Sequence, residues 1–406
     1  MCTDCGDLSH ILGSAGMSRR NLVLGSGALI AGPLIAGGAG EANAQSRPAT
    51  SENAPAMRPF SVRAWGNDSA TSPIIVRQIM RRAVGPNDVH LDVLYCGICH
   101  SDIHQNRDDT PSQRTTFPCV TGHEIIGRVR AVGSAVTKFR AGDIGGVGAM
   151  VDSCGTCKQC LAGREMNCEK GATFTYNTPN KISGGMTFGG YSEGIVVAEH
   201  FVLRVSPGVN LAATAPLLCA GITTFSPMQH WNLEAGQRVG IIGLGGLGHV
   251  AVKLAASRGA DITIFTTSPG KVADAQRLGA REAVLWGDTA AMERLANQFD
   301  LLISTVPQPY ALQPFINLLG LDGTLVNVGA LEGLQDINGL SMIFWRRSIA
   351  GSVIGGIPET QALLDYCALR KITADIELVR PNQIDEAMNR VLEKDVRYRF
   401  VIDMTA

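Results

Sequence analysis

Four cysteines within one short segment constrain the fold of this 406-residue chain more than any other feature. The segment reads C-G-T-C-K-Q-C-L-A-G-R-E-M-N-C and contains Cys154, Cys157, Cys160 and Cys168. Four thiolates at this spacing can surround one tetrahedral Zn²⁺ and leave no coordination position open, which is typical of a structural site. A pair of disulfides is the alternative, but C-x-x-C pairs close loops poorly, so the spacing favours zinc.

The composition indicates a loop-rich α/β protein with many tight backbone turns. Hydrophobic residues make up 45% of the chain, glycine occurs 47 times and aromatic residues contribute only 5%. The formal net charge of −1 gives no sign of the basic surface that nucleic-acid binding requires, nor of an acidic partner surface. The remaining cysteines form no regular ladder, which argues against a disulfide scaffold; they are Cys2, Cys5, Cys96, Cys99, Cys119, Cys219 and Cys367.

The amino terminus has the pattern of an export signal. Arg19-Arg20 precedes a run rich in Gly, Ala, Leu and Ile that ends near Gly38, and Ala42-Asn43-Ala44 follows. Paired arginines, a weakly hydrophobic run and an A-x-A site are typical of a twin-arginine signal peptide. We therefore expect residues 1–44 to be the signal, cleaved after Ala44, and residues 45–59 to be a linker. An uncleaved apolar anchor is the alternative.

The signal also decides the expected location. Export would place the mature protein in the periplasm, whereas an unused signal would leave it in the cytoplasm. Met17 directly precedes Ser18, so either Met1 or Met17 is the start, and Cys2 and Cys5 belong to the protein only in the first case. No later segment has the uncharged apolar length that a bilayer span needs, so we expect no stable membrane anchor after cleavage.

The pattern of apolar residues in the mature chain changes near its middle. From Phe60 to about Val205 the apolar runs are short and alternate, as in residues 89–94 and 195–197, which favours a β-rich, partly barrel-like domain. From about Val239 short apolar strands alternate with amphipathic helices. The expected strands include residues 239–242, 262–265, 301–303 and 325–328. This second pattern predicts βαβ units with a parallel sheet.

A glycine-rich turn, G-L-G-G-L-G, stands at the first strand–helix junction of that second region. Gly243, Gly245 and Gly248 occupy the G-x-G-x-x-G frame, with Gly246 and Leu247 between them. The first glycine permits the tight turn, the second lets a pyrophosphate approach the backbone, and the third lets the helix pack on the strand. The helix N-terminus would then hold the phosphates. The motif therefore predicts a dinucleotide site.

The end of the next strand favours NADP over NAD. An NAD site needs Asp or Glu there for the ribose 2′-hydroxyl, but the chain has Thr266, Thr267 and Ser268, followed by Lys271. Hydroxyls and a lysine can bind a 2′-phosphate that a carboxylate would repel. A solvated helix residue is the alternative interpretation of Lys271.

A second set of cysteine and histidine residues lies in the first region and just after it. C-G-I-C-H-S-D-I-H contains Cys99, T-G-H-E contains His123, and L-L-C-A-G-I-T-T contains Cys219. Three protein ligands of this type leave a fourth zinc position open for substrate or water. Taken singly, Cys219 is equally well explained as a small buried residue, and His123 as a hydrogen-bonded core histidine.

From about Phe60 to the C-terminus, the ordered motifs resemble those of the zinc-dependent medium-chain alcohol dehydrogenases. The branch is the cinnamyl-alcohol-dehydrogenase-like one, which includes bacterial NADPH-dependent aldehyde reductases. Besides the motifs above, the matching segments are G-H-E-I-I-G, G-G-Y-S-E, L-L-C-A-G-I-T-T-F-S-P, G-S-V-I-G-G-I-P-E-T and Y-R-F-V-I-D. The resemblance implies a GroES-like catalytic domain at 60–219, a Rossmann NADP domain at 220–357, and a C-terminal return to the catalytic domain at 358–406.

The resemblance also assigns roles to individual residues. Cys99, His123 and Cys219 are implied ligands of the catalytic zinc, and Cys96 is not a ligand. Glu124 lies behind the metal and can join its shell, and Asp102 supports the ligands. The other implied roles are proton relay for Ser101 and His104, and contact with the nicotinamide ring for Thr223. Thr121 departs from the family, where proline is frequent.

These observations predict an enzyme that transfers hydride between NADP(H) and an alcohol/aldehyde pair, chiefly as an aldehyde reductase. We expect two Zn²⁺ per chain, a small-molecule substrate, no nucleic-acid partner and a homodimer. A zinc-free quinone or enone reductase of the same fold is one alternative, and zinc analysis would distinguish it. An exported metal-binding redox protein is another, and an NADPH-consumption assay would distinguish that.

The export signal generates the first testable prediction. Replacing Arg19 and Arg20 with lysine should trap the precursor in the cytoplasm, because the twin-arginine route reads the arginine pair. Fractionation of cells and immunoblotting of each compartment measure the outcome. An equal periplasmic yield of wild type and variant would contradict this route.

Overall fold

The computed structural model describes residues 58–110, 113–329, 333 and 337–406. The predicted export signal, and the linker up to residue 57, lie outside the described residues. Among the described residues no single helix is long and apolar enough to cross a membrane. One bent pair, Leu211–Leu218 with Ala220–His230, meets that test by length and composition alone.

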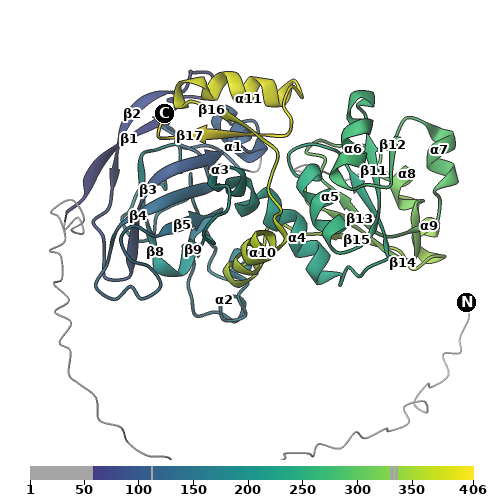
Figure 1. Ribbon diagram of the computed structural model, residues 1–406, viewed down its shortest axis with the longest axis horizontal. Helices are drawn as coiled ribbons and strands as arrows, with labels where there is room; N and C mark the ends of the chain where they lie inside the picture. Colours follow the sequence, from purple (N-terminus) through teal and green to yellow (C-terminus); the bar gives the residue numbers. More distant parts are fainter. Residues whose placement is uncertain (1–57, 111–112, 330–332, 334–336) are drawn as a thin grey trace, which may run out of the picture. The chain divides into compact units, whose positions relative to one another are not determined.

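A seven-stranded sheet organises the first region of the chain (Figure 1). Its order is β16-β17-β3-β4-β5-β9, and β8 also pairs with β3. The strands are β3 (Asp88–Gly97), β4 (Ile125–Val132), β5 (Ile144–Val147), β8 (Gly194–Ala198), β9 (Leu203–Arg204), β16 (Ile376–Val379) and β17 (Arg399–Asp403). All pairs except β16–β17 are antiparallel. Alternating apolar residues in β3 and β4 fit such a sheet.

Smaller elements complete this region. Two hairpin-like sheets are β1 (Phe60–Gly66) with β2 (Ile75–Arg81), and β6 (Met150–Asp152) with β7 (Thr173–Phe174). The helices are α1 (His100–Arg107), α2 (Lys158–Leu161), α3 (Leu211–Thr214), α4 (Ala220–His230), α10 (Ile357–Arg370) and α11 (Ile384–Leu392). Short 3₁₀ helices are η2 (Glu165–Asn167), η3 (Glu199–Phe201), η4 (Ala215–Leu218) and η6 (Pro381–Gln383).

A six-stranded sheet, parallel throughout, forms from the second region. The strands are β10 (Arg238–Ile242), β11 (Asp261–Thr266), β12 (Glu282–Leu285), β13 (Phe299–Ser304), β14 (Leu319–Asn327) and β15 (Ser348–Gly351). The helices are α5 (Gly248–Ser257), α6 (Val272–Leu278), α7 (Thr289–Arg294), α8 (Gln313–Ile316) and α9 (Gly339–Ile343), with the 3₁₀ helix η5 (Pro269–Lys271). The continuous apolar runs of β10 and β13 fit strands that are buried on both faces.

The strand order β12-β11-β10-β13-β14-β15 is that of a doubly wound dinucleotide-binding sheet. The order reverses between β10 and β13, and ligands of such sheets bind outside the carboxyl ends of the strands at this point. Residues 243–248 follow β10 directly, so the sheet topology places the glycine-rich turn at the reversal.

The C-terminal strand returns to the first sheet. Val401 and Ile402 of β17 pair with Gly97 and Cys96 of β3, and the Ile98 amide donates to the Phe400 carbonyl at 2.9 Å. In Figure 1 the yellow strand β17 lies beside β3. Phe400 and its neighbours in β17 are fully buried, so this pairing is part of the core.

Candidate active site

Four side chains from three separate segments converge where β3 ends and β4 begins. The ligand atoms of Cys99, His123, Glu124 and Cys219 all lie within 4.8 Å of one another, and all four residues are buried. Cys99 is the N-cap of α1, His123 and Glu124 immediately precede β4, and Cys219 separates η4 from α4. The structure therefore brings together three residues predicted to be zinc ligands and the predicted neighbouring glutamate.

The donor chemistry of this set fits zinc. The two sulfur atoms of Cys99 and Cys219 are 3.9 Å apart. A disulfide needs about 2.05 Å, whereas two sulfurs bound to one tetrahedral zinc at about 2.3 Å each would be about 3.8 Å apart. The hydrogen bond from Cys219 lowers the pKa of Cys99 well below its usual value, although burial opposes this. Two buried cysteines with an imidazole form the ligand set of an open catalytic zinc site.

Asp102 orients the residues of this set through hydrogen bonds. Its Oδ2 accepts a hydrogen bond from the Cys99 amide at 2.8 Å, and its Oδ1 accepts one from the Gly122 amide at 3.0 Å. Oδ1 also lies 3.1 Å from Nδ1 of His123, which leaves the other ring nitrogen, Nε2, for a metal. Asp102 is fully buried. Such a carboxylate–histidine contact orients metal ligands in many sites.

Glu124 is paired with Arg399, a partner that sequence reasoning missed. The guanidinium of Arg399 donates to Oε1 of Glu124, and the two side chains are 3% and 0% exposed. Burial raises the pKa of Glu124 to about 7, although the charge of Arg399 opposes the rise. The one available sequence signal was an arginine inside the otherwise apolar R-F-V-I strand. Oε2 of Glu124 has no hydrogen-bond partner among the described residues. One of the two carboxylate oxygens lies within 4.8 Å of the ligand atoms of Cys99, His123 and Cys219.

The two predicted relay residues lie on α1, one helical turn apart. Ser101 is exposed, and its hydroxyl oxygen is 3.8 Å from the sulfur of Cys99. Nδ1 of His104 is 2.6 Å from a carboxylate oxygen of Asp109, and its buried Nε2 has no hydrogen-bond partner among the described residues. No direct hydrogen bond joins Ser101 to His104 in the described part of the chain.

The glycine-rich turn has the geometry that its spacing requires. Gly243 has a positive φ of 93°, a conformation that favours glycine. A Cβ on Gly248 would lie 2.0 Å from the Gly243 carbonyl oxygen, whereas one on Gly245 would meet nothing within 4 Å. Gly248 thus allows the helix to pack, and Gly245 leaves open space beside the backbone. Helix α5 begins at Gly248, with Leu247 as its N-cap.

The segment after β11 contains the residues predicted to select NADP. Thr267 is exposed, and Ser268 and Lys271 are half-buried. The ammonium of Lys271 donates to the Leu244 carbonyl at 3.0 Å, so it lies at the glycine-rich turn. No acidic residue occurs between Thr266 and Lys271. Thr223, predicted to contact the nicotinamide, is buried on α4, one turn after Cys219.

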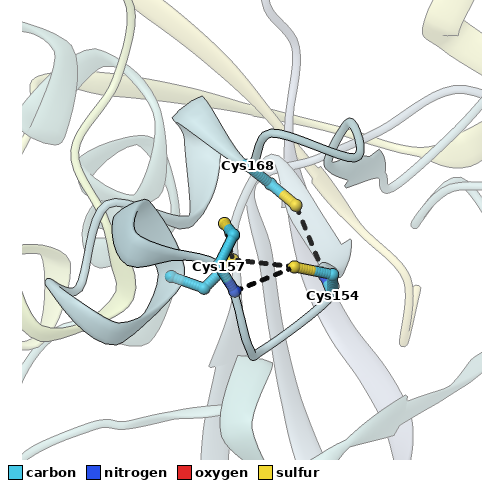
Figure 2. Close-up of side chains that lie close together, drawn as sticks. Cys154, Cys157 and Cys168 are labelled. Atoms are coloured by element: carbon cyan, nitrogen blue, oxygen red, sulfur yellow. Dashed lines mark hydrogen bonds between the residues drawn. The ribbon is translucent and has the colours of Figure 1, made fainter.

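The four-cysteine segment folds into a compact loop around its sulfur atoms. The sulfurs of Cys154, Cys157, Cys160 and Cys168 lie within 4.8 Å of one another, and none forms a disulfide. Figure 2 shows backbone amides directed at two of the sulfurs: Cys157 N to Cys154 Sγ at 3.3 Å and Cys154 N to Cys168 Sγ at 3.4 Å. Backbone hydrogen bonds from Thr156 and Cys157 lower the pKa of Cys154 to about 6. The donor set fits a closed tetrahedral zinc site.

Comparison with known proteins identifies the class to which this fold and these sites belong. Residues 85–207 match the alcohol dehydrogenase GroES-like domain, and residues 246–368 match the zinc-binding dehydrogenase domain. The chain is 49% identical over 346 residues to aldehyde reductase YahK of Escherichia coli K12, covering 85% of this chain and 98% of the relative. It is also 49% identical, over 85% of this chain and 99% of the relative, to NADP-dependent alcohol dehydrogenase C of Mycobacterium bovis.

Comparison with solved structures leads to the same class of protein. A cinnamyl alcohol dehydrogenase from Sorghum bicolor matches with a TM-score of 0.82 and 39% identity, covering 85% of this chain and 98% of that one. CAD from Helicobacter pylori, complexed with NADP(H), matches with a TM-score of 0.80 and 36% identity, covering 85% of this chain and 99% of that one. The chain belongs to the zinc-dependent medium-chain alcohol dehydrogenase family. The predicted fold class, a GroES-like domain with a Rossmann sheet, is confirmed.

The Arg399–Glu124 pair generates a stability prediction. Arg399→Met leaves the Glu124 carboxylate buried without its partner, so the free energy of unfolding should fall by roughly 3–5 kcal/mol. Urea denaturation of the zinc-loaded protein measures the loss, and adding Glu124→Gln should recover most of it. The exposed pair Arg63–Glu193 provides the control, where Arg63→Met should cost less than about 1 kcal/mol. Equal losses for Arg399→Met and Arg63→Met would contradict the prediction.

Proposed function

We propose that this protein transfers hydride between NADP(H) and an alcohol/aldehyde pair, chiefly in the direction of aldehyde reduction. The observation that carries the proposal is the buried set of Cys99, His123 and Cys219, supported by Asp102, in a chain that also has a dinucleotide-type turn. The names of the relatives, aldehyde reductase and NADP-dependent alcohol dehydrogenase, support the same reaction.

In this proposal each metal has its own set of residues. Cys99, His123 and Cys219 hold the catalytic zinc, with Glu124 beside it, and the four-cysteine loop holds a structural zinc. When bound, zinc supplies a Lewis acid for the carbonyl oxygen and NADPH supplies the hydride. Asp102 keeps the His123 ring and the Cys99 backbone in place, which leaves the site rigid before substrate arrives.

The proton needed by the product oxygen comes from α1 in this proposal. The hydroxyl of Ser101 is 3.8 Å from the sulfur of Cys99, a proposed zinc ligand, and would donate the proton. His104, one turn further along the helix, supplies the next proton on the way to solvent. Its contact with Asp109 holds the ring through Nδ1 and leaves Nε2 available. Oxidation of an alcohol moves the proton in the opposite direction.

The two donor sets predict the metal content. The intact mature protein should contain two zinc ions per chain by elemental analysis. Cys99→Ala should lose about one zinc and retain the fold, whereas Cys157→Ala should lose the other and destabilise its loop, since structural metal binding contributes folding free energy. Cys367→Ala, a buried cysteine outside both sets, is the control and should keep both ions. A single zinc in the intact protein would refute the two-site assignment.

The loop after β11 predicts the cofactor preference. If Thr267, Ser268 and Lys271 bind the 2′-phosphate, Lys271→Ala should raise the KM for NADPH roughly tenfold to a hundredfold, because a hydrogen bond to a charged group contributes roughly 1.5–3 kcal/mol. The KM for NADH should hardly change. Thr267→Asp should shift preference toward NADH by repelling the phosphate. Steady-state kinetics with both cofactors measures this, and a wild type that prefers NADH, or equal weakening of both cofactors by Lys271→Ala, would show the assignment to be wrong.

We further propose that the protein is a homodimer that pairs through β15. This strand lies at the end of the parallel sheet, so one of its edges has no strand partner among the described residues. In the segment that leads into it, Leu340, Ile343 and Phe344 are 62%, 71% and 77% exposed. Pairing two such edges about a two-fold axis would cover both the backbone groups and the apolar surface. Light scattering of Phe344→Asp should then report monomers, with Leu369→Asp, an exposed leucine on α10, remaining dimeric.

Export fits this function if the protein crosses the membrane already folded. The twin-arginine route carries folded proteins, so we propose that the enzyme reaches the periplasm with zinc, and with NADP, already bound. Detection of both in protein isolated from the periplasm would support this, and metal-free protein there would contradict it.

A further inference from the structure

Tyr398 lies where the C-terminal segment passes the helices of the parallel sheet. It immediately precedes β17 and is only 2% exposed. Its ring stacks on the ring of His249 in α5, with centroids 4.9 Å apart and an interplanar angle of 13°. Its hydroxyl donates to Asp274 of α6 at 2.7 Å. The ring is therefore held by two helices and has little freedom to move.

Lys271 contacts the same ring. Its ammonium nitrogen is 5.7 Å from the centre of the Tyr398 ring, which is within the range of a cation–π interaction. The ammonium also donates to the Leu244 carbonyl in the glycine-rich turn. One donor is thus used within the protein, and a lysine has two more. Burial is the main reason why the pKa of Lys271 is lowered, and Arg397 and Lys394 lower it further, so a bound anion would stabilise this charge.

His249 connects the ring stack to the glycine-rich turn. Burial lowers the pKa of His249 to about 3, so the imidazole is neutral at ordinary pH. Its Nε2 accepts a hydrogen bond from the Asp375 amide at 3.1 Å, which leaves the proton on Nδ1. Nδ1 can therefore donate to the Gly245 carbonyl, 3.2 Å away. Tyr398 is linked to two neighbouring residues of the turn, Leu244 through Lys271 and Gly245 through His249.

We propose that Tyr398 is a positioning residue for NADP selectivity: its ring holds the Lys271 ammonium beside the glycine-rich turn, in place to bind the 2′-phosphate of the cofactor. A lysine side chain is long and flexible, and ordering it costs rotamer entropy. The fixed aromatic face removes much of this cost before the cofactor arrives. The inference rests on the proposed use of NADP(H) and adds a residue from outside the nucleotide-binding motif.

Two substitutions separate the ring from the hydroxyl. Tyr398→Leu removes the ring, so the dissociation constant for NADPH should rise about threefold to thirtyfold, which corresponds to the range of a cation–π contact. The dissociation constant for NADH should change less than about twofold. Tyr398→Phe keeps the ring and loses only the hydrogen bond to Asp274, so the ratio of the two constants should stay near that of the wild type. Fluorescence titration of zinc-loaded protein with each reduced cofactor measures both constants.

The decisive measurement is a double-mutant cycle with Lys271→Ala. If Tyr398 acts through Lys271, Tyr398→Leu should produce no further loss of selectivity in the Lys271→Ala background. Tyr398→Leu should weaken competition by adenosine 2′-phosphate and leave competition by adenosine 5′-phosphate unchanged. In the Lys271→Ala background it should change neither. Tyr366→Leu is the matched control, because its ring also lies under an arginine, Arg258 at 6.0 Å, and its hydroxyl contacts Ser257 at 2.8 Å. It should leave the selectivity unchanged.

The outcomes distinguish the positioning role of Tyr398 from the assignment of NADP as the cofactor. Equal weakening of NADPH and NADH by Tyr398→Leu, or a selectivity loss that persists with Lys271→Ala, would overturn the positioning role while leaving the NADP assignment intact. A wild type that binds NADH more tightly than NADPH would instead overturn the NADP assignment, and this inference with it. Thermal unfolding shows whether each variant folds. If Tyr398→Leu does not fold, Tyr398→Met, which fills more of the volume without a ring, takes its place in the cycle.

Discussion

The antiparallel pairing of β17 with β3 is the constraint on which both candidate sites depend. It aligns Phe400 with the residue before Cys99 through the Ile98–Phe400 hydrogen bond. Two consecutive residues just upstream, Tyr398 and Arg399, then contact different parts of the molecule. Arg399 meets Glu124 beside the metal-ligand set, and Tyr398 meets α5 and α6 beside the glycine-rich turn. One strand register therefore fixes the surroundings of the candidate metal ligands and of the proposed phosphate site together.

The buried pair of Arg399 and Glu124 selects one register of β17 against β3. Burying two charges costs free energy, and the pair returns it only when the geometry is good. A shift of β17 by one residue would turn Arg399 to the other face of the sheet and leave Glu124 unpaired. Burial already raises the pKa of Glu124 to about 7, so this position disfavours the carboxylate unless Arg399 is paired with it. The charge pair thus penalises wrong registers more than an apolar pair would.

Local spacing identifies the parts of the candidate site that lie within motifs. The four-cysteine loop, the glycine frame and the absence of an acidic residue after β11 can each be recognised within a few residues, because the chemistry requires a fixed spacing. Arg399 and Tyr398 could not be found in this way. Their partners Glu124 and Asp274 are 275 and 124 residues away, and no local period relates them. Only the return of the C-terminal strand brings them into contact.

Gly246 is explained only when the local glycine motif and the C-terminal strand are considered together. The frame G-x-G-x-x-G needs Gly243, Gly245 and Gly248, but Gly246 occupies a position that the frame leaves free. A Cβ on Gly246 would lie 2.7 Å from Cδ of Arg399. Because Arg399 is held by Glu124 and by the register of β17, it has little room to withdraw. Gly246 is therefore explained by the C-terminal strand and not by the nucleotide motif, and the turn that is read as a local signature is shaped by a residue from the far end of the chain.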